Sequence, residues 1–166
     1  HDWKMASISR ATLTRRAMLG AAFATAVSPA FAAGDAEQIA AWFFERYLLQ
    51  SINVARFNAG RISADASKAV EAETPSLQRF LAKHRPAFVA ALLPIIDAQV
   101  PAGETATVAQ EVTSDGTKLS TRTREWLVAI DDEFQKNQQR LLRAMAYELN
   151  VLVEQIVINI RKTPKQ

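Results

Sequence analysis

The spacing of apolar residues predicts helices along most of the chain, and the C-terminal segment gives the clearest pattern. Between Ser120 and about Arg161 the sequence has neither glycine nor proline. Apolar residues recur there at intervals of three or four, with one gap of seven, and this repeat is that of one face of an α-helix. The residues of this apolar stripe are Trp126, Ile130, Phe134, Leu141, Met145, Leu149, Leu152, Ile156 and Ile160. The pattern predicts an amphipathic helix of about forty residues, roughly 60 Å long.

A helix of about forty residues is long for this chain, because helices in globular proteins average about 11–12 residues. The helix is therefore expected either to break near residues 136–139 or to project at one end and contact a partner. Tyr147, Val151 and Ile158 lie off the main apolar stripe and are the residues predicted to form such a contact. Burial of the whole helix inside a bundle is the slightly favoured alternative.

Another helix is predicted from Asp35 to about Asn58, ahead of Gly60. Asp35 and Gln38 fit a capping box at its start, and glycine favours the left-handed conformation that ends many helices. The apolar face of this helix is wide, which is typical of a well-covered helix. Polar residues that include Glu45 and Arg46 occupy the remaining face.

Shorter helices are predicted over 63–73 and 104–112, with turns at 101–103 and 114–116. Thr74 precedes Pro75, a pattern that predicts a helix N-cap followed by proline in the first turn. Pro86 and Pro94 each remove a backbone donor, so two or three short helical pieces are expected between 75 and 100. The sequence thus predicts an all-α fold: one domain over 33–166, an irregular bundle of four to six helices with a long C-terminal helix.

Residues 5–32 have the pattern of a bacterial export signal, and residues 1–4 precede the first methionine, Met5. Basic residues without acids are followed by an apolar run from Ala17 to Val27. Ala30 and Ala32 then supply the small residues that a signal peptidase accepts. We therefore expect cleavage after residue 32 and a periplasmic mature chain. An uncleaved N-terminal membrane anchor is the alternative, although the apolar stretch is shorter than the roughly 20 residues that span a bilayer.

The stretch Thr14-Arg15-Arg16-Ala17-Met18-Leu19 resembles a twin-arginine signal, in which paired arginines are followed after one residue by apolar positions, here Met18 and Leu19. The resemblance covers only the signal, and its lysine-like final position is Gly20. It implies export of the already folded protein, and the ordinary secretory route is the alternative.

The charge of the mature region argues against nucleic acid as a partner. The whole chain has 20 basic and 17 acidic residues, a formal charge of +3. Residues 1–32 contribute four basic residues and one acid, which leaves 16 of each kind in 33–166. A nucleic-acid-binding surface needs an excess of Lys and Arg to neutralise phosphates, and this composition offers none.

Few reactive residues are present. The chain has no cysteine, and His84 is the only histidine of 33–166. We therefore expect no metal site and no cofactor, and no catalytic residue is nominated. His84 is expected to contact helix-terminal carbonyl groups, and Asp131-Asp132-Glu133 to form a solvated face in which Glu133 pairs with Lys136 or Asn137.

Two functions remain open at this point. The first is a non-enzymatic interaction or accessory module that binds a protein partner or a second copy through its long C-terminal helix. The alternative is a small-molecule-binding domain or an enzyme with an apolar pocket near Trp42 and Tyr47, although aromatic residues on a helix are more often core. Membrane contact is expected only transiently, through the signal.

Overall fold

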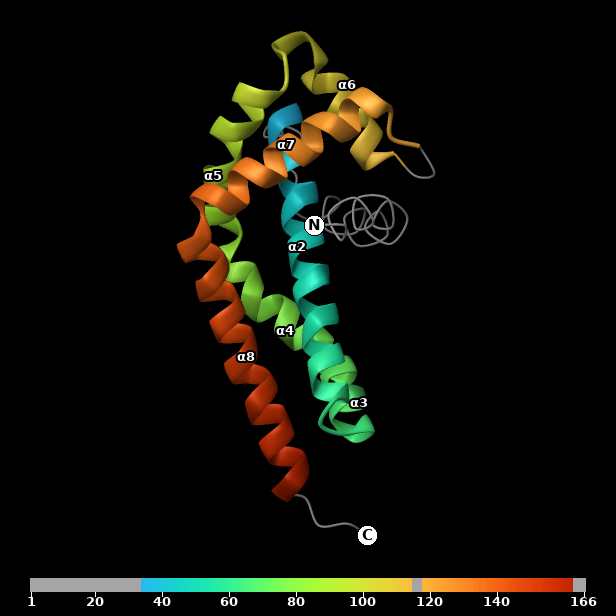
Figure 1. The fold of residues 1–166 in the computed structure, drawn as a ribbon, viewed down its shortest axis with the longest axis vertical. Coiled ribbons are helices and arrows are strands. Elements are labelled where there is room, and N and C mark those ends of the chain that lie inside the picture. Colours follow the sequence, from blue (N-terminus) through green and yellow to red (C-terminus); the bar gives the residue numbers. More distant parts are fainter. Residues whose placement is uncertain (1–33, 115–117, 163–166) are drawn as a thin grey trace. The chain divides into compact units, whose positions relative to one another are not determined.

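The computed structural model describes residues 34–114 and 118–162 and confirms the predicted all-α fold (Figure 1). The helices are α2 (Asp35–Gly60), α3 (Ala64–Ala72), α4 (Thr74–Leu81), α5 (Arg85–Gln99), α6 (Thr105–Thr113), α7 (Thr121–Asn137) and α8 (Gln139–Lys162). Two short 3-10 helices, η2 (Ala82–His84) and η3 (Ala102–Glu104), connect some of them. The expected export signal lies outside the described residues, as does most of the expected turn at 114–116.

The contacts within the chain divide it into two compact units, where the sequence predicts one domain. Among the described residues, the first unit contains 34–46 together with those of Pro86–Gln138, and the second contains Tyr47–Arg85 together with 139–162. Helix α2 therefore contributes its first half to one unit and its second half to the other.

Aromatic side chains form the centre of the first unit. Phe88 of α5 is completely buried, and its ring centroid lies 5.2 Å from that of Phe44 on α2 and 4.5 Å from that of Phe134 on α7. Trp42 and Phe43 are also buried, with their rings 5.1 Å apart in an edge-to-face arrangement. Tilted and edge-to-face arrangements are favoured by the electrostatic quadrupoles of the rings, and the rings also bury a large apolar area.

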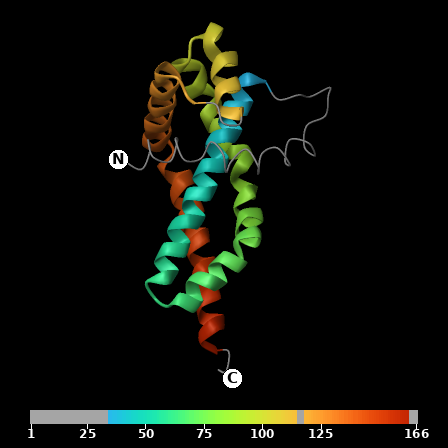
Figure 2. The ribbon, with the colours of Figure 1, turned by 90° about the vertical axis from the view of Figure 1, so that its right-hand side faces the viewer.

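The second unit packs the second half of α2 with α3, α4 and α8. Helices α3 and α4 both lie against α8 (Figure 2). The side chains buried in this unit are mostly aliphatic; they are Leu48, Ile52, Ala55, Ala59, Ala66, Val70, Leu77, Leu81, Met145, Leu149, Val153 and Val157. Non-directional aliphatic packing thus closes this unit.

Two of the predicted helix starts are wrong in detail. Helix α2 begins at Asp35, and the N–H of Gln38 donates to the carbonyl of Gly34, so Asp35 lies in the first turn instead of before it. Thr74 is likewise the first residue of α4, and its hydroxyl donates to the carbonyl of Val70 at 3.1 Å. Both side chains still interact with a helix end. Asp35 places negative charge near the positive end of the α2 dipole, and the Thr74 hydroxyl donates to a carbonyl at the end of α3.

The region from 75 to 100 is divided as predicted, although neither Pro86 nor Pro94 ends a helix. The region forms α4, η2 and α5, which confirms the expected division into two or three pieces. Pro86, however, lies in the first turn of α5, where its missing donor has no intrahelical partner to lose. Pro94 lies inside α5 without ending it.

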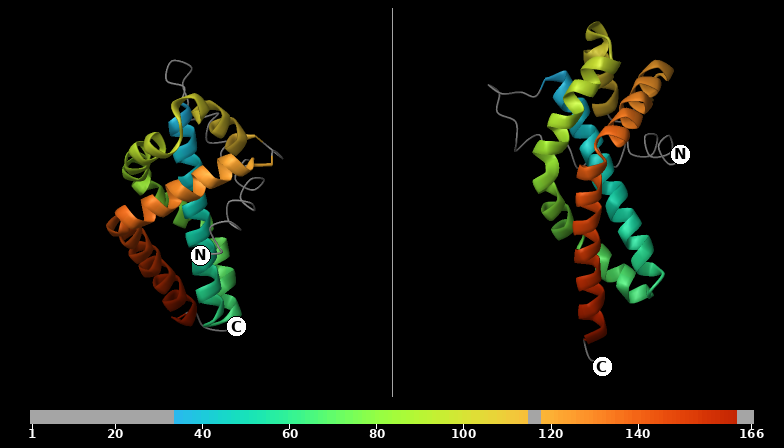
Figure 3. Two further views of the ribbon diagram at one scale, coloured as in Figure 1. Left: turned by 45° about the horizontal axis from the view of Figure 1, so that its top comes forward. Right: turned by 60° about the vertical axis from the view of Figure 1, so that its left-hand side comes forward.

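The long C-terminal segment breaks where the sequence allowed a break. Helix α7 ends at Asn137, Gln138 has φ −117° and ψ 37°, and α8 begins at Gln139. One continuous helix of about forty residues is therefore wrong, and the alternative break within 136–139 is confirmed. The final helix α8 has 24 residues and runs without interruption (Figure 3).

Within the described ranges, no individual helix has both the length and the apolar character needed to cross a membrane. The segments Thr74–Gln99 and Ala102–Thr113, which are bent by 109°, meet that criterion only as a pair, and only by length and composition. Phe88, Leu92 and Ile96 of the first segment are buried within the protein itself.

Candidate interaction surface on the C-terminal helix

Helix α8 has apolar residues on two sides. Met145, Leu149, Val153 and Val157 follow one another at intervals of four and are buried against the second unit. A helix that needs only to cover its own core is polar on the other side. The other side of α8 departs from that rule.

The exposed side of α8 carries Tyr147, Val151 and Ile158, the three residues that the sequence predicts as contact residues. Their exposed fractions are 70%, 47% and 41%. With the exposed Glu154 between them they follow steps of four, three and four, so they form one straight row about 16 Å long. We call Tyr147, Val151 and Ile158 the α8 stripe. The helical repeat places it on nearly the opposite side from the buried row.

Basic residues lie at both ends of the α8 stripe. Arg143 and Arg140 precede it by one and two turns, and Arg161 and Lys162 follow it by one turn; all four are exposed. None of the four forms an ion pair with a carboxylate of the described residues. Glu154 is the only acidic residue in the row itself.

The remaining acid of α8, Glu148, is neutralised by residues from η2. The ammonium of Lys83 lies 2.8 Å from one carboxylate oxygen, and the Nε2 atom of His84 lies 2.5 Å from the other. The hydrogen bond from Lys83, followed by that from His84, lowers the pKa of Glu148. His84 therefore contacts a carboxylate of α8 instead of the helix-terminal carbonyls that the sequence predicts, and it links η2 to α8.

The two units differ strongly in charge and in exposed apolar area. Residues 47–85 and 139–166 of the second unit include eleven basic and five acidic residues, whereas 33–46 and 86–138 of the first include five basic and eleven acidic. The large apolar side chains exposed among the described residues all belong to the second unit; they are Val54, Phe57, Ile62, Phe80, Tyr147, Val151 and Ile158. The second unit is thus both cationic and partly apolar on its surface.

The residues predicted to line a ligand pocket lie in different surroundings. Trp42 is completely buried in the first unit, where the guanidinium of Arg46 lies 4.9 Å from its ring centroid. Its indole N–H has no hydrogen-bond partner among the described residues. Tyr47 is half-buried and belongs to the second unit. Side chains five residues apart on a helix are rotated by about 140°, so the two project from different sides of α2.

Three charged residues of the first unit are buried. Glu45 and Arg46 of α2 and Asp131 of α7 are 7%, 7% and 4% exposed. The expected solvated acidic face is therefore wrong for Asp131, whose carboxylate accepts a hydrogen bond from the amide of Gln135 at 3.0 Å. The expected pairing of Glu133 is confirmed, because the amide of Asn137 donates to it at 2.9 Å.

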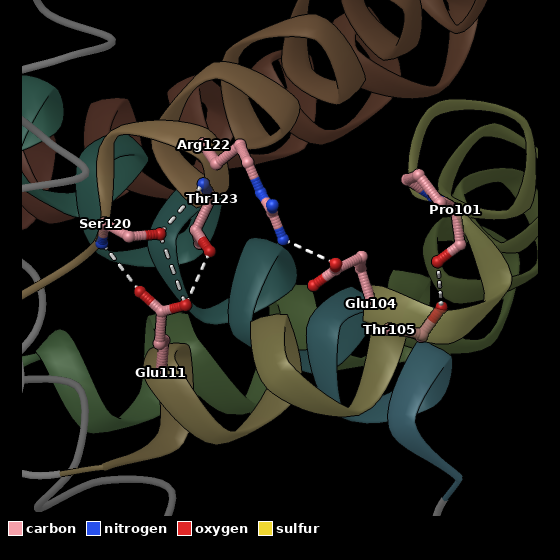
Figure 4. Close-up of polar contacts among 7 residues, drawn as sticks. All are labelled: Pro101, Glu104, Thr105, Glu111, Ser120, Arg122 and Thr123. Atoms are coloured by element: carbon pink, nitrogen blue, oxygen red, sulfur yellow. Dashed lines mark hydrogen bonds and ion pairs between the residues drawn. The ribbon is translucent and has the colours of Figure 1, made fainter.

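A polar cluster joins α6 to the start of α7 in the first unit (Figure 4). Glu111 accepts hydrogen bonds from the backbone N–H of Ser120 at 2.6 Å and from the hydroxyl of Thr123 at 2.7 Å. The hydroxyl of Ser120 accepts from the N–H of Thr123 and so caps α7. Nearby, Arg122 pairs with Glu104 at 2.5 Å. The hydroxyl of Ser120 also lies 3.4 Å from a carboxylate oxygen of Glu111, and these contacts hold the two helix ends together.

In the part of the chain that the structure describes, no three His, Asp or Glu side chains are grouped so as to hold a metal ion. Part of the charge difference between the units can be predicted from the sequence, because segment 86–138 is acidic and segment 139–166 is basic. That 139–166 packs with 47–85 in one unit is seen only in the structure.

Comparisons of the chain with family models, with curated proteins and with solved structures found no match.

Proposed function

We propose that this protein is an exported, non-enzymatic interaction module that binds a partner protein through the α8 stripe. One observation carries the proposal: α8 covers its own core with one side and presents Tyr147, Val151 and Ile158 in a row on the other. The row is not needed to close the second unit, because a separate set of side chains on α8 does so.

The free energy gained by burying apolar side chains favours binding of a partner to the α8 stripe. Burying a Val or Ile side chain completely contributes about 1.5–3 kcal/mol relative to leaving it exposed. Val151 and Ile158 are 47% and 41% exposed, so covering them is expected to contribute roughly half of that amount each. Tyr147 adds the aromatic area and the hydroxyl that make tyrosine frequent at binding hot spots.

The proposed location rests on the sequence of residues 5–32. Removal of the signal after Ala32 leaves α2 whole, because that helix begins at Asp35. A chain that crosses the membrane already folded, as the twin-arginine resemblance implies, arrives with its α8 stripe formed.

The alternative of a pocket near Trp42 and Tyr47 is less well supported, although the indole N–H of Trp42 lacks a hydrogen-bond partner among the described residues. Trp42 is covered by its own unit, and its ring is contacted by Phe43 and Arg46. These are the contacts of a core residue.

The proposal is tested by placing a photo-cross-linking amino acid at position 151 and, in a matched variant, at position 54 in the producing bacterium. Val151 and Val54 are both valines of the second unit with 47% exposure. We expect a discrete adduct from position 151 that is lost when Ile158→Glu is added, and none from position 54. No adduct at 151, or the same adduct at both positions, would refute the proposal.

A further inference from the structure

The charges at the two ends of the α8 stripe limit what can cover it. Arg140 and Arg143 lie before the stripe, and Arg161 and Lys162 lie after it. Of the two acids of α8, Glu154 lies within the row, and Glu148 is held by Lys83 and His84. A partner that covers the stripe therefore meets exposed positive charge at both ends.

A second copy of the same chain fits this arrangement poorly. If two α8 helices pair in parallel, each basic end faces the same basic end of its partner. If they pair antiparallel about the middle of the stripe, Arg143 faces Lys162. Either orientation opposes like charges, which disfavours a pairing. The first unit of another copy is acidic, but the large exposed apolar residues of the described chain all lie in the second unit, so it offers no matching apolar row.

The chain's own N-terminal segment is also a poor match by charge. Residues 1–32 contain Lys4, Arg10, Arg15 and Arg16 against one acid, Asp2. Placing this segment on the stripe would add positive charge to a surface that is already positive.

A membrane surface fits the charge but not the shape of the stripe. Helices that lie in a bilayer interface bury a wide apolar face. The α8 stripe is a single row interrupted by Glu154, and the larger apolar face of α8 is already buried in the second unit. A narrow row with charges alongside it is the geometry of a helix-to-helix seam.

We infer that the α8 stripe binds an acidic amphipathic helix of a different protein. The inference rests on the function proposed above and specifies the partner: apolar residues at intervals of three and four that pack on Tyr147, Val151 and Ile158, and carboxylates at both ends that pair with the four basic residues. The opposed charges guide the approach of the partner and fix its register, and the apolar row provides most of the affinity.

The test uses two designed peptides of about three heptads, with the same apolar row and with either Glu or Lys at the flanking positions. Binding of each fluorescent peptide to the full chain is measured by anisotropy at low and at physiological salt. We expect the Glu peptide to bind at least about tenfold more tightly than the Lys peptide. We also expect this preference to shrink as salt is added.

Two pairs of variants locate the binding surface. Val151→Glu is expected to weaken binding of the Glu peptide by about tenfold or more, whereas Val54→Glu, with the same exposure in the same unit, leaves it unchanged. The double variant Arg143→Glu with Arg161→Glu is expected to reverse the preference, so that the Lys peptide binds better. Arg61→Glu with Lys68→Glu, which changes two exposed cations of the second unit that are not on α8, is the matched control. Helical content by circular dichroism accompanies each variant, and the reversal is a gain of binding that an unfolded protein does not produce.

Four outcomes overturn the inference. They are equal binding of the two peptides, binding of neither, Val151-dependent binding of vesicles containing anionic lipid without peptide binding, and Val151-dependent self-association in sedimentation. If the cross-link from position 151 joins this chain to a different protein in any of these cases, the proposed docking role stands and only the acidic helical partner is wrong. If that cross-link is absent as well, both fail.

Discussion

Replacing Phe88 by alanine tests whether the aromatic cluster holds the first unit together. Phe88 is completely buried, and its ring lies between those of Phe44 and Phe134, at centroid distances of 5.2 and 4.5 Å. The substitution removes the whole ring from a packed site and takes one member from two aromatic pairs.

The expected loss of stability is large. A buried Phe→Ala substitution costs about 3–5 kcal/mol, including the cavity that remains. The two ring pairs, each worth about 0.5–1.5 kcal/mol beyond area burial, place Phe88→Ala toward the upper part of that range. Domains of ordinary size have a free energy of unfolding of about 5–15 kcal/mol, so the variant loses a substantial part of its stability.

The measurement is urea unfolding of the full chain followed by circular dichroism, with Phe57→Ala as the control. Phe57 is 69% exposed, so the same chemical change there is expected to alter the free energy of unfolding by about 0.5 kcal/mol or less. The m-values of both variants are compared with that of the parent, because the comparison of midpoints requires them to agree. A loss below about 1 kcal/mol for Phe88→Ala, or equal losses for the two variants, would refute the reasoning.

Three further predictions follow from local features. Ser120→Ala removes the side chain that caps α7 and is expected to cost about 1 kcal/mol in the same urea assay; no loss would show that the cap is dispensable. The pKa of Glu148 is lowered, chiefly by the hydrogen bond from Lys83. The ionised carboxylate therefore stabilises the fold fully at pH values above the pKa of an unfolded glutamate, and this stabilisation is lost as the pH falls through the lowered pKa. The stability difference between the parent and Glu148→Gln is therefore expected to shrink on acidification, and a difference that is constant from neutral to acid pH contradicts this. Replacing Arg15 and Arg16 by lysine is expected to abolish export and processing, measured by cell fractionation and N-terminal sequencing of the product; undiminished processing would indicate the ordinary secretory route instead.

The sequence predicts the helices well because their apolar repeat is a local property. The range of the first described helix, the short helix near 104–112 and the break within 136–139 follow from spacing, from Gly and Pro, and from the interruption of the stripe around Asn137. The exact helix starts are less predictable, because a residue such as Thr74 can be either the N-cap that precedes a helix or the first residue of the helix. The choice depends on neighbours such as Val70, whose carbonyl accepts the Thr74 hydroxyl proton.

The polar contacts could not be predicted in the same way. Glu111 and Thr123 are twelve residues apart, and His84 and Glu148 are 64 residues apart, so no local repeat brings them together. Asp131 was predicted to be solvated because acidic residues rarely face the core. Its burial depends on how α7 packs within the first unit and on the hydrogen bond from Gln135.

The charge difference between the units shows why a neutral total is a weak argument about partners. Residues 33–166 have equal numbers of acidic and basic residues, yet the chain passes between the units at 46/47, 85/86 and 138/139 and distributes those charges unequally. Binding responds to the local field, which decays over about 8–10 Å at physiological salt. Neutrality of the whole therefore argues against a broad cationic surface, but it does not argue against a cationic end on a single helix.

The position of the α8 stripe is expected to make folding and the proposed binding separable by mutation. Residues that close a core cannot be changed to charged residues without loss of the fold, because an unpaired charge in the interior is strongly unfavourable. Val151 is already 47% exposed, so a carboxylate there remains hydrated and is expected to change the free energy of unfolding little. Val153, two residues later on the same helix, is 9% exposed and faces the core, and glutamate there is expected to destabilise the second unit. Loss of binding with retained stability for Val151→Glu, together with loss of stability for Val153→Glu, would assign the two sides of α8 to two different tasks; equal destabilisation by both would mean that the outer row is part of the core.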